Sequence, residues 1–459
     1  DLVPPTELSP TARLPLGVKI PGPTIQDDPD TYLFDARVDG TTVTFDRLLD
    51  CGLRMTKSFQ FEDDAYIVHT ELTFTNETDN VAYVGQDEKP AYLLTWEPGL
   101  EDPALRSKSR YGNVMGAVWL GKNLKFNDKS RKPATFTAFD AQWAGIKTRY
   151  FAAVIRPSVV PATIEGHALG DKGSGGQSVS VLAPSFRLEP GATHTDTYDL
   201  FMGPLELSTL RGLGHEYKRL VNFGMFRPVA IVMLWFLRTS YKIIPNYGIA
   251  IILLTVLVRV LLYPLNHKSF QSMRKMQTLR PAMQEIEQKY KDKPQERAKK
   301  MMALQKEHGV SMFGGCLPMF AQFPIWIALF RTLQNSIELR GAGFAFWIKD
   351  LSSPETIMTL PVTLPILGNE LHLLPLVMAG IMLLQQKMMP TAGTGPQADS
   401  QKMMMVMMPI MMGVLFYSMP SGLCLYILVS TLLGIGQQYL VHRSMETEKP
   451  SGQPAKPTK

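Results

Sequence analysis

The sequence has 459 residues but only three cysteines, Cys51, Cys316 and Cys424. They are odd in number, lie far apart and form no Cys-x-x-Cys pair, which excludes a disulfide-stapled scaffold and the common zinc sites. Charged residues are also few, at 19%, whereas hydrophobic residues make up 45% and aromatic residues 9%. This balance excludes a chain that is disordered throughout.

The sequence also lacks the motifs of the commoner catalytic sites. It contains no P-loop, no metal-ligand spacing and no nucleophile triad. We therefore predict a protein that is not an enzyme and that uses no cofactor or metal. The chain begins at Asp1 without a signal segment or a preceding apolar span, so we expect a truncated or processed chain.

The formal net charge of +6 is distributed unevenly along the chain. Residues 1–225 carry 23 basic and 29 acidic side chains, a net charge of −6. Residues 265–311 carry 11 basic and 5 acidic side chains, and the remainder carries 13 and 7, so each of these parts has a net charge of +6. The mean hydropathy of −0.02 is likewise an average of a polar first half and a more apolar second half.

Five apolar runs in the second half approach the length that crosses a membrane, which is about 20 residues with a range of about 17–25. They are Asn246–Pro264, Leu317–Ser336, His372–Met389, Met403–Met419 and Leu423–Val441. One such run alone would fit a buried helix of a soluble protein equally well. Five in succession, separated by polar loops, predict a polytopic membrane domain.

The charges of the loops predict an orientation, because cytoplasmic loops are enriched in Lys and Arg. The loop after the first run is the +6 segment, the loop 338–371 after the second has a net charge of −2, and the tail after the fifth has +2. Every second connection is therefore basic and is predicted to be cytoplasmic. The acidic residues 1–225 then lie outside the cytoplasm.

Residues from about 10 to 205 contain many short stretches that alternate with period two. Ala65–Thr75 is one of them, and turn residues such as Asn76, Pro98-Gly99 and Pro190-Gly191 separate them. This pattern predicts a large β-sandwich.

A membrane-anchored carbohydrate-active enzyme is an alternative function for this β block. Its acid–base groups would come from His69, His167, His194, Glu71 and Glu165. Polar residues on strand faces are the simpler interpretation, because no spacing forces two of these side chains together.

A connecting region follows the β block. Leu205–Phe223 is predicted to form a helical connector. The next segment, Phe226–Ile244, contains the apolar stretch Val229–Leu237 between basic residues. This stretch is too short to span a bilayer, and its Trp and basic ends predict a helix that lies in the membrane interface.

Arg259 lies inside the first apolar run, five residues before Pro264. A central arginine costs about 2.5–3.5 kcal/mol on membrane-insertion scales. It could snorkel to the cytoplasmic headgroups, or it could face a water-containing cavity and attract acidic groups. Thr255 lies one turn earlier on the same face of the predicted helix.

Two other runs carry residues that are unusual in plain lipid-facing helices. Pro318 and Pro324 interrupt the second run, with the amide of Gln322 between them. This pattern fits an ordinary kinked helix or a helix that lines something other than lipid. The fourth run has eight methionines within residues 403–419, which fill space toward lipid or form an adaptable apolar surface.

The basic segment 265–311 is predicted to form two antiparallel helices, about 267–291 and 295–308, with a turn at Asp292-Lys293-Pro294. Apolar residues recur with helical spacing on one face, opposite basic residues. The basic side chains singled out are Lys268, Arg274, Lys275, Lys289, Lys291 and Lys293. Attraction to anionic lipid headgroups accounts for part of this charge.

Several ordered motifs in residues 225–445 resemble the bacterial YidC branch of the YidC/Oxa/Alb insertase family. They are TVLVRVLLYPL, the basic hairpin, GGCLPMFAQFPIWIALF, ELRGAGFAFWIKDLS and MPSGLCLYILVSTLLGIGQQYL. The acidic β block is similar in arrangement to the periplasmic domain of Gram-negative members. The resemblance implies an additional N-terminal span, which would explain the missing signal.

The resemblance implies a mixed fold in the bacterial inner membrane. We expect a periplasmic all-β supersandwich over residues 1–205 and a connector with an interfacial amphipathic helix over 206–245. An α-helical core with five spans would cover 246–445 and include the cytoplasmic hairpin 265–311. A flexible cytoplasmic tail would cover 446–459.

The resemblance also implies a function. Family members insert and fold client inner-membrane proteins, alone or with the Sec translocon, through a hydrophilic groove that is closed on the outer side. The implied groove residues are Arg259, Thr255, Gln322 and Tyr426, and the implied substrate contacts are Pro318, Phe323, Pro324 and Phe416. Two positions depart from the family pattern, because Ile427 replaces the second residue of a tyrosine pair and Leu317 replaces a phenylalanine.

The implied partners are nascent membrane-protein clients, the Sec translocon with SecDF, and the lipid bilayer. The ribosome and the signal-recognition receptor would bind the basic hairpin and tail. A channel or transporter is an alternative, although it would need a through-pore or paired repeats, and five runs without internal repeats provide neither.

Overall fold

The structure is a computed structural model, and the chain divides into two compact units, Asp1–Val221 and Asn222–Lys459. We call them the β unit and the helical unit. The structure describes residues 16–21, 33–63, 65–85, 89–97, 100, 115–121, 123–127, 136–160, 162–169, 176–291, 293–309, 317–364, 368–388 and 396–447.

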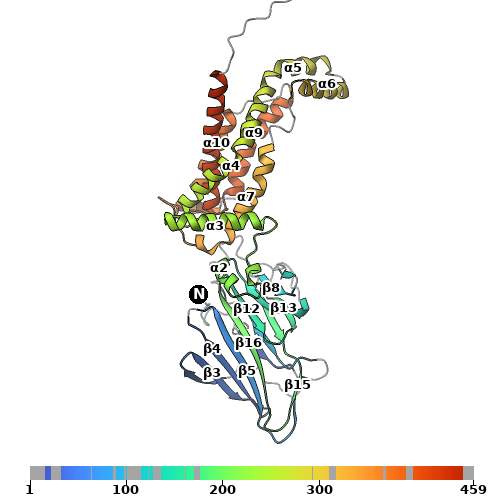
Figure 1. The fold of residues 1–459 in the computed structure, drawn as a ribbon, viewed down its shortest axis with the longest axis vertical. Helices are drawn as coiled ribbons and strands as arrows, with labels where there is room; N and C mark the ends of the chain where they lie inside the picture. The colour runs from blue at the N-terminus through green and yellow to red at the C-terminus, as the bar shows by residue number, and fades with distance from the viewer. Residues whose placement is uncertain are drawn as a thin grey trace, which may run out of the picture. The chain divides into compact units, whose positions relative to one another are not determined.

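The described part of the β unit consists mainly of antiparallel strands (Figure 1). Strand β5 illustrates the cause, because Val68, Thr70, Leu72 and Phe74 are buried while their neighbours along the strand are more exposed. The strands are β1 (Gly17–Lys19), β2 (Asp35–Asp39), β3 (Thr42–Leu48), β4 (Leu53–Phe61), β5 (Ile67–Asn76), β6 (Ala82–Val84), β7 (Leu93–Trp96), β8 (Met115–Trp119), β9 (Leu124–Asn127), β10 (Phe136–Ala141), β11 (Trp143–Lys147), β12 (Phe151–Pro157), β13 (Ala162–Leu169), β14 (Gly176–Leu182), β15 (Phe186–Leu188) and β16 (Thr193–Pro204).

Two large sheets form the β unit. One has five strands in the order β1-β7-β14-β13-β10, and the other has nine in the order β2-β3-β4-β5-β16-β12-β11-β8-β9. The long strand β16 pairs with β5 on one side and β12 on the other, with Asp199 opposite His69 and Arg156. The predicted β-sandwich is confirmed.

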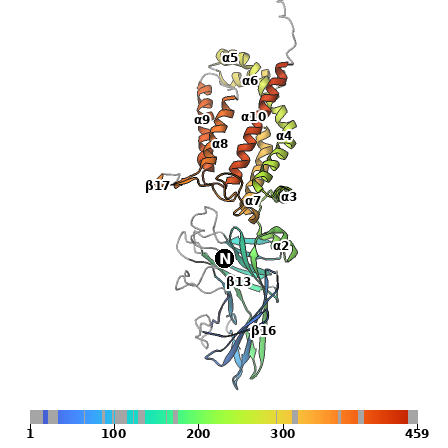
Figure 2. The same cartoon turned by 90° about the vertical axis from the view of Figure 1, so that its left-hand side faces the viewer.

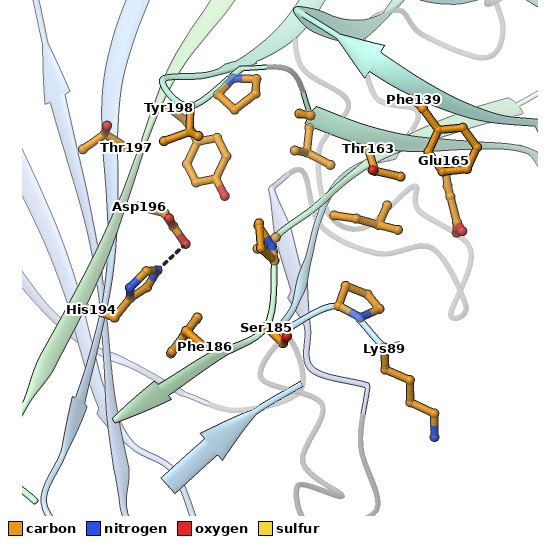
Figure 3. Close-up of a pocket in the computed structure, with 18 of the residues that line it drawn as sticks. Lys89, Phe139, Thr163, Glu165, Ser185, Phe186, His194, Asp196, Thr197 and Tyr198 are labelled. Carbon is orange, nitrogen blue, oxygen red and sulfur yellow. Dashed lines mark ion pairs between the residues drawn. The ribbon is translucent and has the colours of Figure 1, made fainter. Parts of the chain in front are cut away.

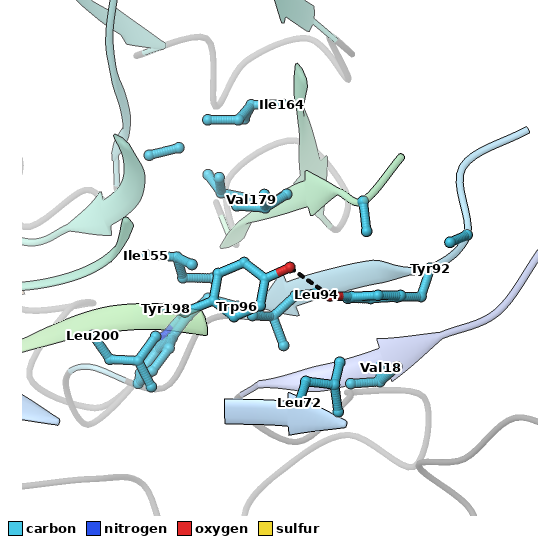
Figure 4. Close-up of a cluster of buried hydrophobic side chains, with 14 of the residues drawn as sticks. Val18, Leu72, Tyr92, Leu94, Trp96, Ile155, Ile164, Val179, Tyr198 and Leu200 are labelled. Carbon is cyan, nitrogen blue, oxygen red and sulfur yellow. Dashed lines mark hydrogen bonds between the residues drawn. The ribbon is translucent and has the colours of Figure 1, made fainter. Parts of the chain in front are cut away.

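The core of the β unit lies between the two sheets (Figure 4). Trp96 and Val179 come from the five-stranded sheet, and Leu72 and Leu200 from the nine-stranded sheet, and all four are buried. Tyr92 is also buried, and its hydroxyl bonds to that of Tyr198 at 2.7 Å. Complementary faces from both sheets therefore exclude water, as in other sandwiches.

The helical unit begins after the short elements α2 (Leu207–Gly212) and η3 (Tyr217–Leu220). Its helix α3 packs against α4 and α7, α10 packs against α4 and α8, and α8 packs against α9 (Figures 1 and 2). The helices are α3 (Arg227–Ile243), α4 (Tyr247–Thr278), α5 (Arg280–Lys289), α6 (Pro294–Glu307), α7 (Leu317–Asn335), α8 (Leu373–Met388), α9 (Pro396–Phe416) and α10 (Ser421–Thr447).

The five predicted apolar runs fall largely within α4, α7, α8, α9 and α10. Within the described residues, two segments are long and apolar enough to cross a membrane, Tyr247–Ser272 of α4 and Ser421–Leu440 of α10. Shorter apolar segments occur at Leu373–Lys387 and Val406–Phe416. A helical region after the β-sandwich is thus confirmed, whereas the number of spans stays a prediction.

Two local expectations differ from the structure. The first hairpin helix is not separate, because α4 continues to Thr278 and α5 begins only at Arg280. The loop 338–371 contains an unexpected two-stranded hairpin, β17 (Met358–Leu364) with β18 (Gly368–Leu371). Its prolines had hidden the strand pattern, since Pro is disfavoured inside sheets.

His69 joins an ion-pair network on the nine-stranded sheet. Its Nδ1 lies 2.6 Å from Asp199 Oδ1, and its Nε2 lies 2.9 Å from Glu62 Oε1. The hydrogen bond to Asp199, followed by that to Glu62, raises the pKa of His69 above its usual value. Because the folded pKa exceeds the unfolded one, this stabilisation is complete below about pH 6.5 and is lost as pH rises through the folded pKa.

We therefore predict that His69→Gln destabilises the β unit more at pH 5.5 than at pH 9. The difference should be at most about 1 kcal/mol, because the pair is partly exposed to water. Denaturant unfolding followed by near-UV circular dichroism at both pH values measures it. An equal loss at both pH values would show that the charge of His69 plays no part.

Candidate functional site

Four helices of the helical unit bring polar groups together around Arg259. Arg259 is on α4, and its Nε donates to Ser430 Oγ of α10 at 3.0 Å. Its Nη2 also donates to the backbone carbonyl of Ser430. The guanidinium is therefore fixed to one turn of a neighbouring helix, in the planar multidentate manner that arginine allows.

Gly434 of α10 lies beside the same guanidinium. A Cβ atom at this position would lie 3.1 Å from Arg259 Nη2 and 3.2 Å from Nε2 of Gln385, which comes from α8. Glycine therefore leaves the space that Arg259 occupies, and Gln385 brings an amide to the same place.

Gln322 and Tyr426 form the next part of the cluster. Gln322 Nε2 of α7 donates to the hydroxyl oxygen of Tyr426 at 2.6 Å. Tyr426 is buried, and it lies one turn before Ser430 on α10. Tyr426, Ser430 and Gly434 thus share one face of α10 at successive helical turns.

No carboxylate within the described residues forms an ion pair with Arg259. A positive charge among hydroxyl and amide groups is solvated but not neutralised, so it can still attract an anion. We name Arg259, Gln322, Gln385, Tyr426 and Ser430 the arginine cluster. Water or the acidic group of a bound chain would complete its hydrogen bonding.

Thr255 does not join this cluster through a hydrogen bond. It is fully buried, and its hydroxyl donates at 2.7 Å to the backbone oxygen of Ile251 in its own helix. The sequence had placed it on the face of Arg259. In the structure its hydroxyl makes a hydrogen bond within its own helix, as is common for threonine in helices.

The expected substrate contacts differ from one another in exposure. Phe323 of α7 is 55% exposed, whereas Phe416 of α9 is buried, with its ring 5.5 Å from that of Trp326. Pro324 is half-buried within α7, and the side chain of Pro318 lies outside the described residues. Exposed apolar residues on α9 include Met407, Ile410, Met411 and Val414.

The expected basic surface is present on the described side chains of the hairpin. Lys268 and Lys275 lie on the last turns of α4, Lys289 ends α5, and Lys291 and Lys293 precede α6. All five are exposed, and the side chain of Arg274 lies outside the described residues. Their charges are available to anionic partners.

Sequence reasoning missed three members of the site, Ser430, Gly434 and Gln385. Ser430 and Gly434 could have been found from their spacing, because they follow Tyr426 by one and two turns. Gln385 gave no such signal, since its approach to Arg259 depends on how α8 packs against α10.

The β unit contains a separate pocket of about 810 Å³ (Figure 3). Glu165 and His194 both line it, but the His194 ring stacks on Phe186 with 3.9 Å between centroids and pairs with Asp196 at 3.2 Å. His167 pairs with Glu165 at 3.6 Å, and neither His69 nor Glu71 lines the pocket. The five candidate acid–base residues are therefore not gathered into one site.

Within the described ranges, no group of three or more His, Cys, Asp or Glu side chains is placed to hold a metal ion. The arginine cluster itself offers hydrogen bonding and charge attraction by its side chains.

Comparison with known proteins relates both units to one family. Residues 239–449 match the family described as "60Kd inner membrane protein", and residues 21–236 match "YidC periplasmic domain". The membrane protein insertase YidC of Pelobacter propionicus is 33% identical over 396 residues, which cover 85% of this chain and 70% of that protein. That of Geobacter sulfurreducens is 32% identical over 411 residues, covering 88% and 71%.

Among solved structures, an active YidC insertase with its first transmembrane domain resolved aligns with this chain at a TM-score of 0.39 and 18% identity. The alignment covers 89% of this chain and 94% of the other.

The packing around Arg259 predicts that Gly434→Val lowers the thermal stability of the detergent-solubilised protein. Overpacking of this kind costs about 1–3 kcal/mol. Gly436→Val is the matched control, because no described atom lies within 4 Å of a Cβ placed there and the change in helix propensity is the same. Equal melting temperatures for the two variants would contradict the close approach of Arg259.

Proposed function

Because the chain belongs to the YidC family of membrane protein insertases, we propose that it inserts client proteins into the bacterial inner membrane and helps them fold. The observation that carries this proposal is the arginine cluster, in which a guanidinium with no carboxylate partner among the described residues lies among polar groups from several helices. It supports a hydrophilic groove within the membrane domain.

In this proposal α4, α7, α8, α9 and α10 are five spans, and the β unit is periplasmic. The 16-residue helix α8 is about 24 Å long, which is less than the hydrocarbon thickness of about 30 Å. Short spans favour a locally thinned bilayer at modest cost. A polar client segment then has less hydrocarbon to cross.

Arg259 acts by attracting the acidic residues of a client's translocated tail. Its two donors to Ser430 hold the guanidinium in one orientation, so little side-chain entropy remains to be lost when an anion binds. The amides of Gln322 and Gln385 and the hydroxyl of Tyr426 supply further hydrogen-bonding groups to the passing backbone. No covalent step is involved.

The client's apolar helix leaves the groove along the exposed apolar side chains of α7 and α9. Phe323 and the methionines Met407 and Met411 offer a soft surface that fits varied sequences. Transfer to lipid stabilises each buried methylene by about 0.8 kcal/mol, so no nucleotide is needed for this step. Phe416 can contact the client only if its ring moves away from that of Trp326.

The partners proposed for this function follow from the charge distribution. The exposed lysines of α4, α5 and the α5–α6 turn suit the ribosome, the signal-recognition receptor and anionic headgroups. The Sec translocon and SecDF are proposed to cooperate in the insertion of larger clients.

We expect Arg259→Ala to reduce the insertion of clients with acidic translocated tails more than that of clients with uncharged tails. The loss for acidic tails should be at least about fivefold, since hydrogen bonds to charged groups contribute about 1.5–3 kcal/mol. Protease protection of clients inserted into proteoliposomes measures both classes.

Arg259→Lys is the matched control for this experiment, because it keeps the charge but loses the two-donor attachment to Ser430. It should retain part of the preference for acidic tails. Equal losses for both client classes in Arg259→Ala would refute the role of the charge.

Removing residues 268–306 should reduce insertion while the remaining helices of the unit stay folded. A finer variant changes Lys289, Lys291 and Lys293 to Gln, and its control changes the same residues to Arg. We expect insertion of ribosome-delivered clients to fall in the Gln variant and to persist in the Arg variant. Normal insertion by the deletion variant would count against a role for the hairpin.

A further inference from the structure

The β17–β18 hairpin, residues 358–371, has no role in the groove described above. In Figure 2 it extends sideways from the helices, at the end of the helical unit where α3 also lies. Within the described residues, the contacts of its two strands are mainly with each other. The hydroxyl of Tyr417 donates to Glu370 O of β18 at 2.9 Å, but a two-stranded hairpin is only marginally stable in water and gains from a further surface.

The base of the hairpin is fixed at the start of a membrane-crossing helix. Ser421, the first residue of α10, donates its backbone N–H to Ser353 O at 2.9 Å and its hydroxyl to Asp350 O at 2.7 Å. Ile357 N donates to Leu371 O at 3.0 Å and closes the base of the hairpin. The candidate span of α10 begins at Ser421, so a bilayer that surrounds this span would have its boundary near these bonds.

The base of the hairpin has one apolar pair and one polar pair, before the register of the two strands becomes irregular beyond Thr359. Met358 is paired with Leu371, and the next pair is Thr359 with Glu370. Successive residues of a strand point to opposite faces, so the apolar pair lies on one face and the polar pair on the other. Met358 is 51% exposed although it is apolar.

The sequence of the hairpin is also nearly free of charge. No charged residue occurs between Glu355 and Glu370, while Ile357, Met358, Leu360, Val362, Leu364, Ile366 and Leu367 are apolar. Ile357 and Met358 at the base of the hairpin are exposed, and exposed apolar side chains on a strand in water are an aggregation hazard. Beside a bilayer, the same composition is favourable.

We propose that the β17–β18 hairpin lies in the membrane interface and rests on the lipid surface around the helical unit. The face with Met358 and Leu371 is directed toward the acyl chains, and the face with Thr359 and Glu370 toward headgroups and water. Lipid is the occupant because the base is at a span end, the hairpin extends sideways, and its two faces differ in polarity. The inference depends on membrane residence and not on insertion activity.

The test compares adjacent positions on opposite faces. Met358→Cys and Thr359→Cys are made separately in full-length protein whose native cysteines have been replaced, Cys51 and Cys316 by Ser and Cys424 by Ala. Each is spin-labelled and reconstituted in vesicles of phosphatidylcholine and phosphatidylglycerol. Oxygen, which concentrates in hydrocarbon, and a water-soluble nickel chelate are the two collision probes.

We expect the ratio of oxygen to nickel collision rates to be several-fold higher at 358 than at 359. Nickel-dominated values at both positions would overturn the proposal, because the hairpin would then lie in water. Labels that are immobile and reached by neither probe would also overturn it, because a second copy or another part of the chain would then cover the hairpin. Val159→Cys, on the β unit and 76% exposed, gives the reference value for water.

Discussion

The packing of the helical unit around α4 depends on how the positive charge of Arg259 is hydrogen-bonded. An arginine inside an apolar helix is stable only if other groups replace its hydration shell. Here Ser430 supplies two acceptors, Gly434 supplies space, and amides from two further helices lie nearby. The packing of α4 against α10 and α8 is therefore tied to a polar interaction as well as to apolar contact.

In the proposed function, the absence of a carboxylate partner among the described residues keeps the charge of Arg259 available. A buried ion pair would satisfy the arginine fully and would have little left to offer a client. Neutral hydrogen-bond acceptors stabilise the guanidinium while its charge remains available. The β unit differs, because Asp199 there forms ion pairs with both Arg156 and His69, and this network joins adjacent strands.

The sequence predicted those features that depend on local pattern. Alternation located strands such as β5 and β16, and apolar runs located the long helices. The cost of Arg259 identified it as the most informative residue, whereas Tyr426 was nominated only by the resemblance to the family. Contacts between helices could not be predicted in this way, so Gln385 was missed, and the hydrogen bond of Thr255 to Ile251 within its own helix was not foreseen. Phe416 was nominated as a client contact by the resemblance, and the packing of its ring against Trp326 distinguishes it from its exposed neighbours on α9.

Helix α4 has 32 residues and is about 48 Å long, so it continues well beyond the hydrocarbon layer. This single helix carries Arg259 in its first half and Lys268 and Lys275 in its second half. In the proposed function, a force applied to the basic end, for example by a docked ribosome, would act on the same helix that holds the guanidinium. Pro264 lies between these two parts of the helix and removes a backbone hydrogen bond, so it is the point at which the helix bends most easily. In the proposed function, cytoplasmic docking and the position of the charge within the membrane would be linked through this single helix.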